Sequence, residues 1–148
     1  MGGVSSERNI SIKTGNAIVA SLSKKYEIKP VDVLFDDHFS FLNEIQSEDI
    51  VFNALHGGSG ENGDIQSVLE MREISYTGSD SKASRICMDK HISKLIAEME
   101  GVKVPKWILY RDSQINNQKI FNVKKEKFPY PYIVKPNNEG STMGLAKV

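Results

Sequence analysis

The sequence has a single cysteine, Cys87, so it carries no internal disulfide framework. It has no excess charge of either sign, because 19 lysine and arginine residues balance 19 aspartate and glutamate residues. Balanced charge gives no overall field that would favour nucleic acid or an anionic membrane surface. No apolar run approaches the ~20 residues of a bilayer-spanning helix. The first residues, rich in glycine and serine, show no signal-peptide pattern.

What is present is an alternation of helical and extended patterns in the first half of the chain. Helices are expected over 5–22, 38–45 and 63–71, and strands over 27–34, 49–55 and 74–77. The apolar side expected for the first helix consists of Ile10, Ala17, Ile18 and Leu22, and that of the helix over 63–71 consists of Ile65, Val68 and Leu69. This order predicts an α/β fold, with a parallel sheet and helices on its faces. Such a domain normally opens with a strand before its first glycine-rich turn. Here Met1-Gly2-Gly3 stands where that turn would be, so the first strand is expected to be missing, either because the start is truncated or because the fold has lost it.

The pattern changes after Ser79, and we place a domain boundary near Ser81, between residues 1–80 and 81–148. Two helices are expected over 81–88 and 89–100, the second capped by Asp89 and ended by Gly101. A strand is expected over 104–109, followed by a polar stretch, 116–127, that fits a helix or a loop. A strand–loop–strand unit completes the sequence.

The loop of that last unit carries the strongest local signal. An apolar strand, 132–134, ends at Lys135 and is followed by a turn rich in glycine and hydroxyl groups, 137–144. Lysine supplies a compact positive charge, and glycines let backbone N–H groups approach anionic oxygens. The pattern predicts a polyphosphate grip. It differs from a P-loop, because no lysine directly follows the second glycine.

His56 follows the most apolar strand, at the edge where parallel sheets bind ligands. Its placement fits a ligand contact and fits a structural hydrogen bond to the loop equally well. The next residues, Gly58 to Gly63, match the G-x-G-x-x-G pattern of dinucleotide-binding turns. Glu61 and Asp64 would place negative charge beside a pyrophosphate, so an ordinary turn before a helix is favoured. A nicotinamide-dependent oxidoreductase built on this turn stays an alternative.

Charged residues at two helix starts have a plain and a functional interpretation. Glu7 complements the helix dipole, or it holds a substrate ammonium at the mouth of the sheet. Arg8 beside it serves either a ligand carboxylate or Glu7 itself. Lys90 is unfavourable near a helix start, which a phosphate partner would explain. A solvated surface lysine is the simpler interpretation of Lys90 taken alone.

Taken together, several segments resemble the D-alanine–D-alanine ligases, ATP-grasp enzymes of peptidoglycan precursor synthesis. These segments are GGVSSERNIS, VFNALHGGSGENGDIQSVLE, ISYTGSDSKAS, MDKHISK, VPKW and IVKPNNEGSTMG. They follow one another in the family's order and spacing over nearly the whole chain. The resemblance implies a Rossmann-like N-terminal domain over 1–80. It implies a partial ATP-grasp small subdomain, with a glycine-rich loop, over 81–148.

The resemblance also implies roles for single residues. Glu7 would bind the ammonium of the first D-alanine, and His56 would lie near the substrate carboxylate. Lys90 and Lys135 would contact the phosphates of ATP. The loop that closes over them would consist of Glu139, Gly140, Ser141 and Thr142. Ser141 would link that loop to the substrate side, which makes Glu7 and Ser141 the catalytic candidates.

Four positions depart from the family pattern. Asn62 replaces an aspartate, Ser75 a proline, Asp80 a glycine and Thr142 a serine. The first three bear on tight turns and leave the chemistry untouched. Thr142 keeps a hydroxyl group.

In the reaction that the resemblance implies, ATP phosphorylates a D-alanine carboxylate and the amine of a second D-alanine attacks the acylphosphate. Mg²⁺ would assist, with its ligands in a C-terminal part beyond Val148. The complete protein would be a cytoplasmic homodimer that serves cell wall biogenesis and cell shape, without nucleic-acid or membrane partners. We expect the chain to be a fragment, inactive alone, with a non-catalytic remnant or binding module as another alternative. The second substrate, D-alanine, D-lactate or D-serine, is left open.

Overall fold

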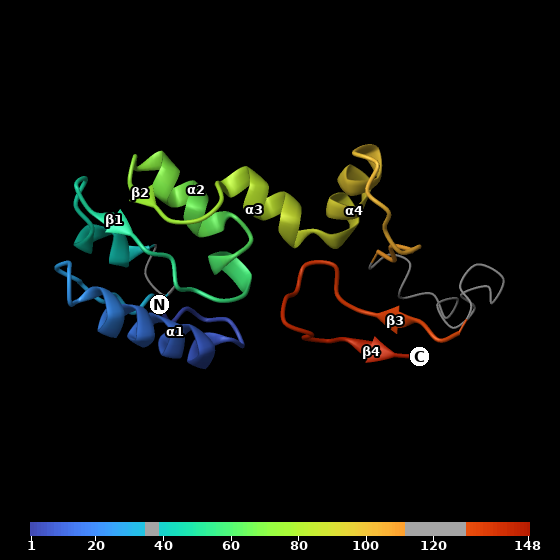
Figure 1. The fold of residues 1–148 in the computed structure, drawn as a ribbon, viewed down its shortest axis with the longest axis horizontal. Coiled ribbons are helices and arrows are strands. Elements are labelled where there is room, and N and C mark those ends of the chain that lie inside the picture. The colour runs from blue at the N-terminus through green and yellow to red at the C-terminus, as the bar shows by residue number, and fades with distance from the viewer. Residues whose placement is uncertain (35–38, 112–129) are drawn as a thin grey trace. The chain divides into compact units, whose positions relative to one another are not determined.

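The structure, a computed structural model, describes residues 1–34, 39–111 and 130–148. The chain forms two compact units, a first unit of Met1–Met88 and a second unit of Asp89–Val148. The first unit contains α1 (Arg8–Leu22), η1 (Ser40–Glu44), β1 (Ile50–Val51), η2 (Gly58–Gly60), α2 (Asp64–Met71), β2 (Ser75–Tyr76) and α3 (Ser81–Met88) (Figure 1). The second unit contains α4 (Lys90–Met99), β3 (Ile133–Val134) and β4 (Ala146–Lys147). The division at residues 80 and 81 stays a prediction.

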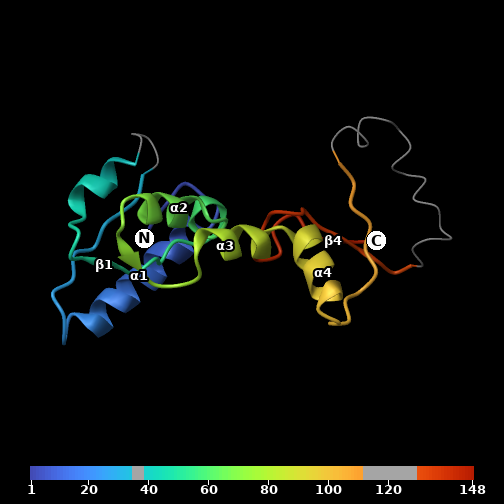
Figure 2. The ribbon, with the colours of Figure 1, turned by 90° about the horizontal axis from the view of Figure 1, so that it is seen from above.

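Parallel strand pairing organises the first unit. β1 and β2 pair in parallel, and Gly2 forms a separate parallel bridge with Val33. The Gly3 N–H donates to the Val33 carbonyl and the Val33 N–H donates to the Met1 carbonyl, each at 2.8 Å. The chain's first residues thus supply ladder hydrogen bonds of the kind that a first strand makes. Figures 1 and 2 show the segment after β1 running between α1 and α2, and the α/β class is confirmed.

Helix α1 packs through small and polar residues. Its buried residues are Ser11 and Gly15. The Ser11 hydroxyl donates to the Ala54 carbonyl at 2.7 Å and accepts the Gly2 N–H at 2.8 Å. The apolar face predicted for this helix is therefore wrong in part, because Ile10 is half exposed. Hydrogen bonds of Ser11 and the contact of Gly15 with the Met1 side chain, rather than an apolar stripe, hold this helix in place.

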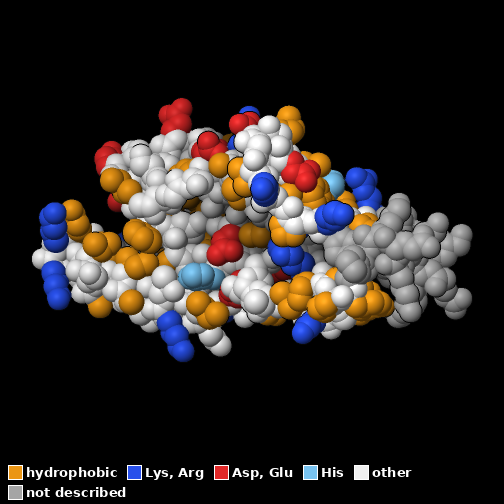
Figure 3. Space-filling model, turned by 45° about the vertical axis from the view of Figure 1, so that its right-hand side comes forward, with side chains coloured by type: hydrophobic (Ala, Val, Ile, Leu, Met, Phe, Trp, Pro, Cys, Tyr) orange, Lys and Arg blue, Asp and Glu red, His pale blue; other side chains and the backbone are white. Residues whose placement is uncertain are grey.

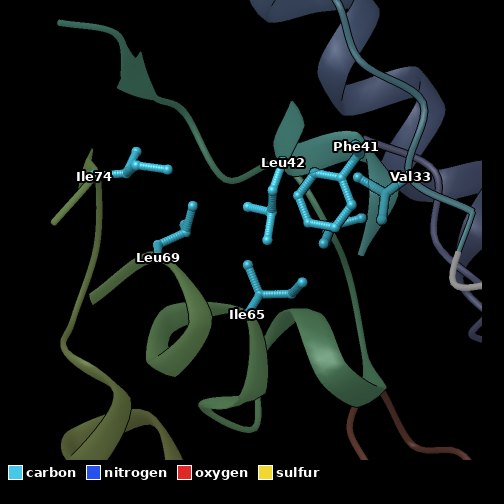
Figure 4. Packing of buried hydrophobic residues seen from close by; sticks show 7 residues of the cluster. Val33, Phe41, Leu42, Ile65, Leu69 and Ile74 are labelled. Atoms are coloured by element: carbon cyan, nitrogen blue, oxygen red, sulfur yellow. The ribbon is translucent and has the colours of Figure 1, made fainter. Parts of the chain in front are cut away.

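The core of the first unit lies between α2, η1 and the extended segments. Its buried residues are Val33, Phe41, Leu42, Leu55, Ile65, Leu69 and Ile74, and Figure 4 shows most of them pointing toward one another. Ile65 and Leu69 lie four residues apart, on one face of α2, as the periodicity predicts. Leu69 is fully buried, and a side chain of this kind stabilises a fold by ~1.5–3 kcal/mol.

The second unit begins with a capped helix. The Asp89 carboxylate accepts the Ile92 N–H at 2.9 Å, which confirms the predicted N-cap of α4. Gly101 has a φ of 76°, the left-handed conformation that ends many helices, as predicted. β3 and β4 form an antiparallel pair. None of the described residues of this unit is buried. Figure 3 shows hydrophobic side chains, in orange, at the surface on the side of the molecule that it draws.

The strands are shorter than the sequence predicts. The segment 104–109 contains no strand, so that prediction is wrong. The strand predicted over 49–55 is limited to β1, in which Ile50 is 74% exposed. Within the described residues β1 pairs with β2 alone, so its other edge has no strand beside it. The polar stretch 116–127 lies outside the described residues. None of the helices described is long and apolar enough to cross a membrane.

Candidate functional site

Glu7 and His56 come together in the first unit, at the end of the segment after β1. Glu7 directly precedes α1, and it is only 6% exposed. Ser5 joins the two residues, because its hydroxyl donates to the His56 carbonyl at 2.5 Å and accepts the Glu7 N–H at 3.2 Å. A Cβ at Gly57 would lie 2.6 Å from Glu7 Oε2, so the carboxylate lies directly against this glycine. Gly57 also has a φ of 68°, which favours glycine.

The Glu7 carboxylate has no hydrogen bond or ion pair within the described part of the chain. Arg8, its neighbour in sequence, pairs with Asp32 instead, with 2.5 Å between Nη2 and Oδ2. Asp32 therefore accounts for Arg8 in place of the two partners considered from the sequence, a ligand carboxylate and Glu7. Buried carboxylates are normally paired or hydrogen-bonded, because burying a lone charge is unfavourable. The arrangement therefore leaves a negatively charged position open to a cationic group.

A pocket of about 110 Å³ is lined by residues next to Glu7, among them Ser5 and Gly57, although Glu7 itself is not part of its wall. Its walls are Gly3, Val4, Ser5, Leu55, His56, Gly57, Gly58, Ser59 and Gly60. The volume exceeds the ~30 Å³ share of one water molecule and falls below the ~300–1,000 Å³ typical of drug-sized ligands. The pocket therefore suits a small ligand, and it is too small for a dinucleotide.

The histidine ring has a polar neighbour at each nitrogen. Nε2 lies 3.1 Å from the hydroxyl of Thr14 in α1, and Nδ1 lies 3.7 Å from Glu61 Oε1. The sequence analysis missed Thr14. A signal for it exists, since Thr14 follows Glu7 and Ser11 at helical spacing and so shares their side of α1.

The glycines of the G-x-G-x-x-G match serve close packing inside the chain. A Cβ at Gly60 would lie 2.4 Å from the Leu55 side chain, and one at Gly63 would lie 2.3 Å from the Ser81 carbonyl. The Asn62 side chain accepts the N–H of Asp64 at 3.0 Å, at the start of α2. These contacts favour the ordinary turn over a dinucleotide-binding loop.

In the second unit, Lys90 holds the start of the glycine-rich loop. Its Nζ donates to the Asn137 carbonyl at 3.1 Å and also to the Glu139 carbonyl. The Asn137 side chain accepts the N–H of His91 at 3.0 Å. Lys90 therefore ties the N-terminus of α4 to this loop, and a phosphate that contacted Nζ would compete with two carbonyl oxygens.

The charge of Lys135 acts on two lysines of α4. Burial lowers the pKa of Lys90 and the charge of Lys135 lowers it further, while Glu139 and Asp89 act in the opposite direction. Burial and Lys135 also lower the pKa of Lys94. Lys94, which the sequence analysis missed, lies one helical turn after Lys90 with its Nζ 5.3 Å from the centre of the Trp107 ring. A cluster of positive charge of this kind favours a polyanion.

The loop itself contains an unusual turn. Ser141 and Thr142 have φ values of 46° and 65°, and the Met143 N–H donates to the Gly140 carbonyl at 3.0 Å. Two central residues at positive φ are the property of a type I′ turn, which normally contains glycine, asparagine or aspartate. Threonine is β-branched and rarely adopts positive φ. Strained positions of this kind occur often at ligand clamps. Glu139, Ser141 and Thr142 are exposed.

The fold is thus of the α/β class, with an unpaired carboxylate in one unit and a lysine-lined loop in the other. The family model described as D-ala D-ala ligase N-terminus matches residues 34–79, and the one described as D-ala D-ala ligase C-terminus matches residues 96–148. A curated D-alanine–D-alanine ligase of Bacillus anthracis is 42% identical over 98% of this chain and 46% of its own length. The chain therefore belongs to the D-alanine–D-alanine ligase family.

Solved structures agree with this assignment. A crystal structure of D-alanine–D-alanine ligase from Bacillus anthracis matches all of this chain and 47% of its own, with a TM-score of 0.82 and 41% identity. A structure of the ligase from that organism complexed with ATP matches with a TM-score of 0.80 and 39% identity, over all of this chain and 48% of its own. The chain thus spans about half the length of the curated relatives and solved structures that it matches.

Proposed function

We propose that this chain supplies the first-substrate site and the phosphate-binding loop of an ATP-dependent D-alanine–D-alanine ligase. The observation that carries the proposal is the Glu7 carboxylate, which has no partner among the described residues and lies against Gly57, a residue that lines a small pocket. An ammonium group would neutralise it. D-alanine is small enough for such a pocket and carries an ammonium. The family assignment supports the same substrate.

Different residues bind the ammonium of D-alanine, its carboxylate and the phosphates of ATP. Glu7 binds the ammonium, and His56 lies near the carboxylate that is to be activated. Lys90 and Lys135 attract the phosphates, because positive charge stabilises the transferring phosphoryl group. The loop of Glu139, Gly140, Ser141 and Thr142 closes over the phosphates and excludes water, and Ser141 connects it to the substrate side.

The reaction that fits these roles has two steps. The D-alanine carboxylate attacks the terminal phosphorus of ATP, which releases ADP and forms an acylphosphate. The amine of a second D-alanine then attacks the acyl carbon, which releases phosphate and forms the peptide bond. Lysine charges lower the repulsion between the carboxylate and ATP, both of which are anions.

Mg²⁺ is expected in the complete enzyme. The described residues contain no group of three or more His, Cys, Asp or Glu side chains able to hold a metal ion. The described residues therefore do not fit the ion, and no step above depends on it. We further propose that the complete enzyme is a cytoplasmic homodimer that serves peptidoglycan synthesis.

The binding half of the proposal can be tested on the chain itself. D-alanine titrated into ¹⁵N-labelled protein should shift the amide signals of Gly57 and Gly58, and L-alanine should do so less. Glu7→Gln should abolish the shift, whereas Glu27→Gln, at an exposed position, should leave it unchanged. Equal shifts in wild type and Glu7→Gln would contradict the assignment.

The catalytic half needs a longer protein. The chain alone should release no phosphate from ATP with D-alanine and Mg²⁺ beyond the level of its Lys135→Ala variant. Joining it to the C-terminal half of the Bacillus anthracis relative should restore D-alanine-dependent phosphate release. Activity of the chain alone, above that of the variant, would show that the fragment interpretation is wrong.

A further inference from the structure

The ring of His56 is held from α1 by one threonine. Thr14 Oγ1 lies 3.1 Å from Nε2, across 42 positions of sequence. Hydroxyl groups of threonines inside helices often bond to the carbonyl four residues earlier. Within the described residues, the hydrogen bond recorded for this hydroxyl is with His56 instead. The side chain is therefore turned toward the histidine.

Thr14 belongs to a polar stripe on α1. Glu7 precedes the helix, Ser11 lies four positions later and Thr14 three positions after that, a spacing that places them along one side. Ser11 bonds the Ala54 carbonyl at 2.7 Å and Thr14 bonds the His56 ring. This stripe follows the segment 54–56 and fixes both its backbone and the histidine side chain.

The neighbour of the second ring nitrogen of His56 indicates which nitrogen carries the proton. Nδ1 is 3.7 Å from Glu61 Oε1, too long for a hydrogen bond but close enough for the negative charge to favour a proton on Nδ1. In the neutral ring the other nitrogen, Nε2, is then an acceptor. A threonine hydroxyl can donate to it, and can accept from it when the ring becomes charged.

We propose that Thr14 is a positioning residue. Together with Glu61, it favours the tautomer of the neutral His56 ring in which the proton lies on Nδ1. The Nδ1–H is then left as a donor for an oxygen of a bound carboxylate. This last step rests on the proposed function, in which His56 lies near the D-alanine carboxylate. The tautomer itself does not depend on that function.

The tautomer can be measured by ¹⁵N NMR of the imidazole rings in the 148-residue chain at alkaline pH. The chain has three histidines, so His56→Gln assigns the signals of His56. Wild type and Thr14→Ser should show the Nδ1–H form. Thr14→Val, which keeps the shape and removes the hydroxyl, should shift the population toward Nε2–H, and Thr14→Ala provides a second test if the valine variant folds poorly. An Nε2–H ring in wild type, or wild-type spectra for both the valine and alanine variants, would overturn the proposal.

D-alanine binding separates this proposal from the function. Loss of one hydrogen bond to the histidine should weaken D-alanine binding by about two- to tenfold in Thr14→Val, with recovery in Thr14→Ser. Unchanged D-alanine affinity in Thr14→Val despite an altered tautomer would overturn the positioning role. If wild type binds no D-alanine but shows the Nδ1–H form that Thr14→Val loses, the tautomer proposal stands and the proposed substrate is wrong.

Discussion

Replacing Glu7 by glutamine is expected to stabilise the first unit while it removes the ammonium site. The side chain is 6% exposed, and its carboxylate has no partner among the described residues. Glutamine keeps the size and removes the charge. In the free protein this charge has no protein partner but keeps some contact with solvent, so it lowers stability less than a fully enclosed charge would, and an ammonium ligand would offset that loss.

The size of the effect follows from the cost of a buried polar group without a partner. That cost is about 1–3 kcal/mol, and more for a charged group. Glutamine also carries a polar group and the Glu7 oxygens keep some solvent contact, so we expect the free energy of unfolding to rise by about 1 kcal/mol, the lower end of this range. In a domain of 60–100 residues each kcal/mol raises the melting temperature by roughly 4–8 °C.

Urea denaturation followed by the methyl signals of Leu69, in the core of this unit, measures the change. Glu27→Gln is the matched control, because Glu27 is exposed and surface substitutions are usually within about 0.5 kcal/mol of wild type. D-alanine at 100 times its dissociation constant should stabilise wild type by about 2.7 kcal/mol and leave Glu7→Gln unaffected. Destabilisation by Glu7→Gln would refute the reasoning, since it would show that the carboxylate has a structural partner.

Three further predictions concern other parts of the chain. Thr142→Gly should stabilise the chain by about 1–2 kcal/mol in thermal denaturation, because glycine tolerates the positive φ of this position; a lower melting temperature would contradict the strain. In the chain joined to the C-terminal half of a relative, Lys135→Ala should weaken ATP binding in calorimetry by about 1.5–3 kcal/mol, whereas Lys106→Ala, also exposed, should not, and equal losses would remove Lys135 from the phosphate site. Burial, with help from a hydrogen bond to Glu70, raises the pKa of Tyr76 to about 12. Its contribution to stability should be complete below the ordinary value of 10.0 and disappear as the pH rises through about 12, and Glu70→Gln should bring its ultraviolet titration closer to 10.0.

Local signals allowed several elements to be predicted from the sequence. The Asp89 cap and Gly101 bound the second unit's helix as expected, because each acts on backbone groups a few residues away. The period of Ile65 and Leu69 gave the buried face of α2. Family motifs gave the ligase family, which the comparisons confirm. The roles of the candidate site residues stay predictions.

The length and burial of strands could not be predicted in the same way. Ile50 belongs to an apolar run that resembles a buried strand, yet it is 74% exposed. Burial of a strand depends on what lies beside it and on both faces. Since β1 pairs with β2 alone among the described residues, the apolar pattern overstates its burial. In α1 the polar residue Ser11 is buried, although its polarity favours exposure, because its hydroxyl forms hydrogen bonds with backbone groups.

The sequence by itself determined the α/β class, the main helices and the residues of the glycine-rich loop, because each depends on contacts within a few positions or on a motif read in order. Only the tertiary structure placed Thr14 at the ring of His56 and showed that the charge of Lys135 acts on Lys94. These partners lie about forty positions apart in the chain. No local pattern encodes which distant side chains meet, because that depends on how the packed elements close upon one another.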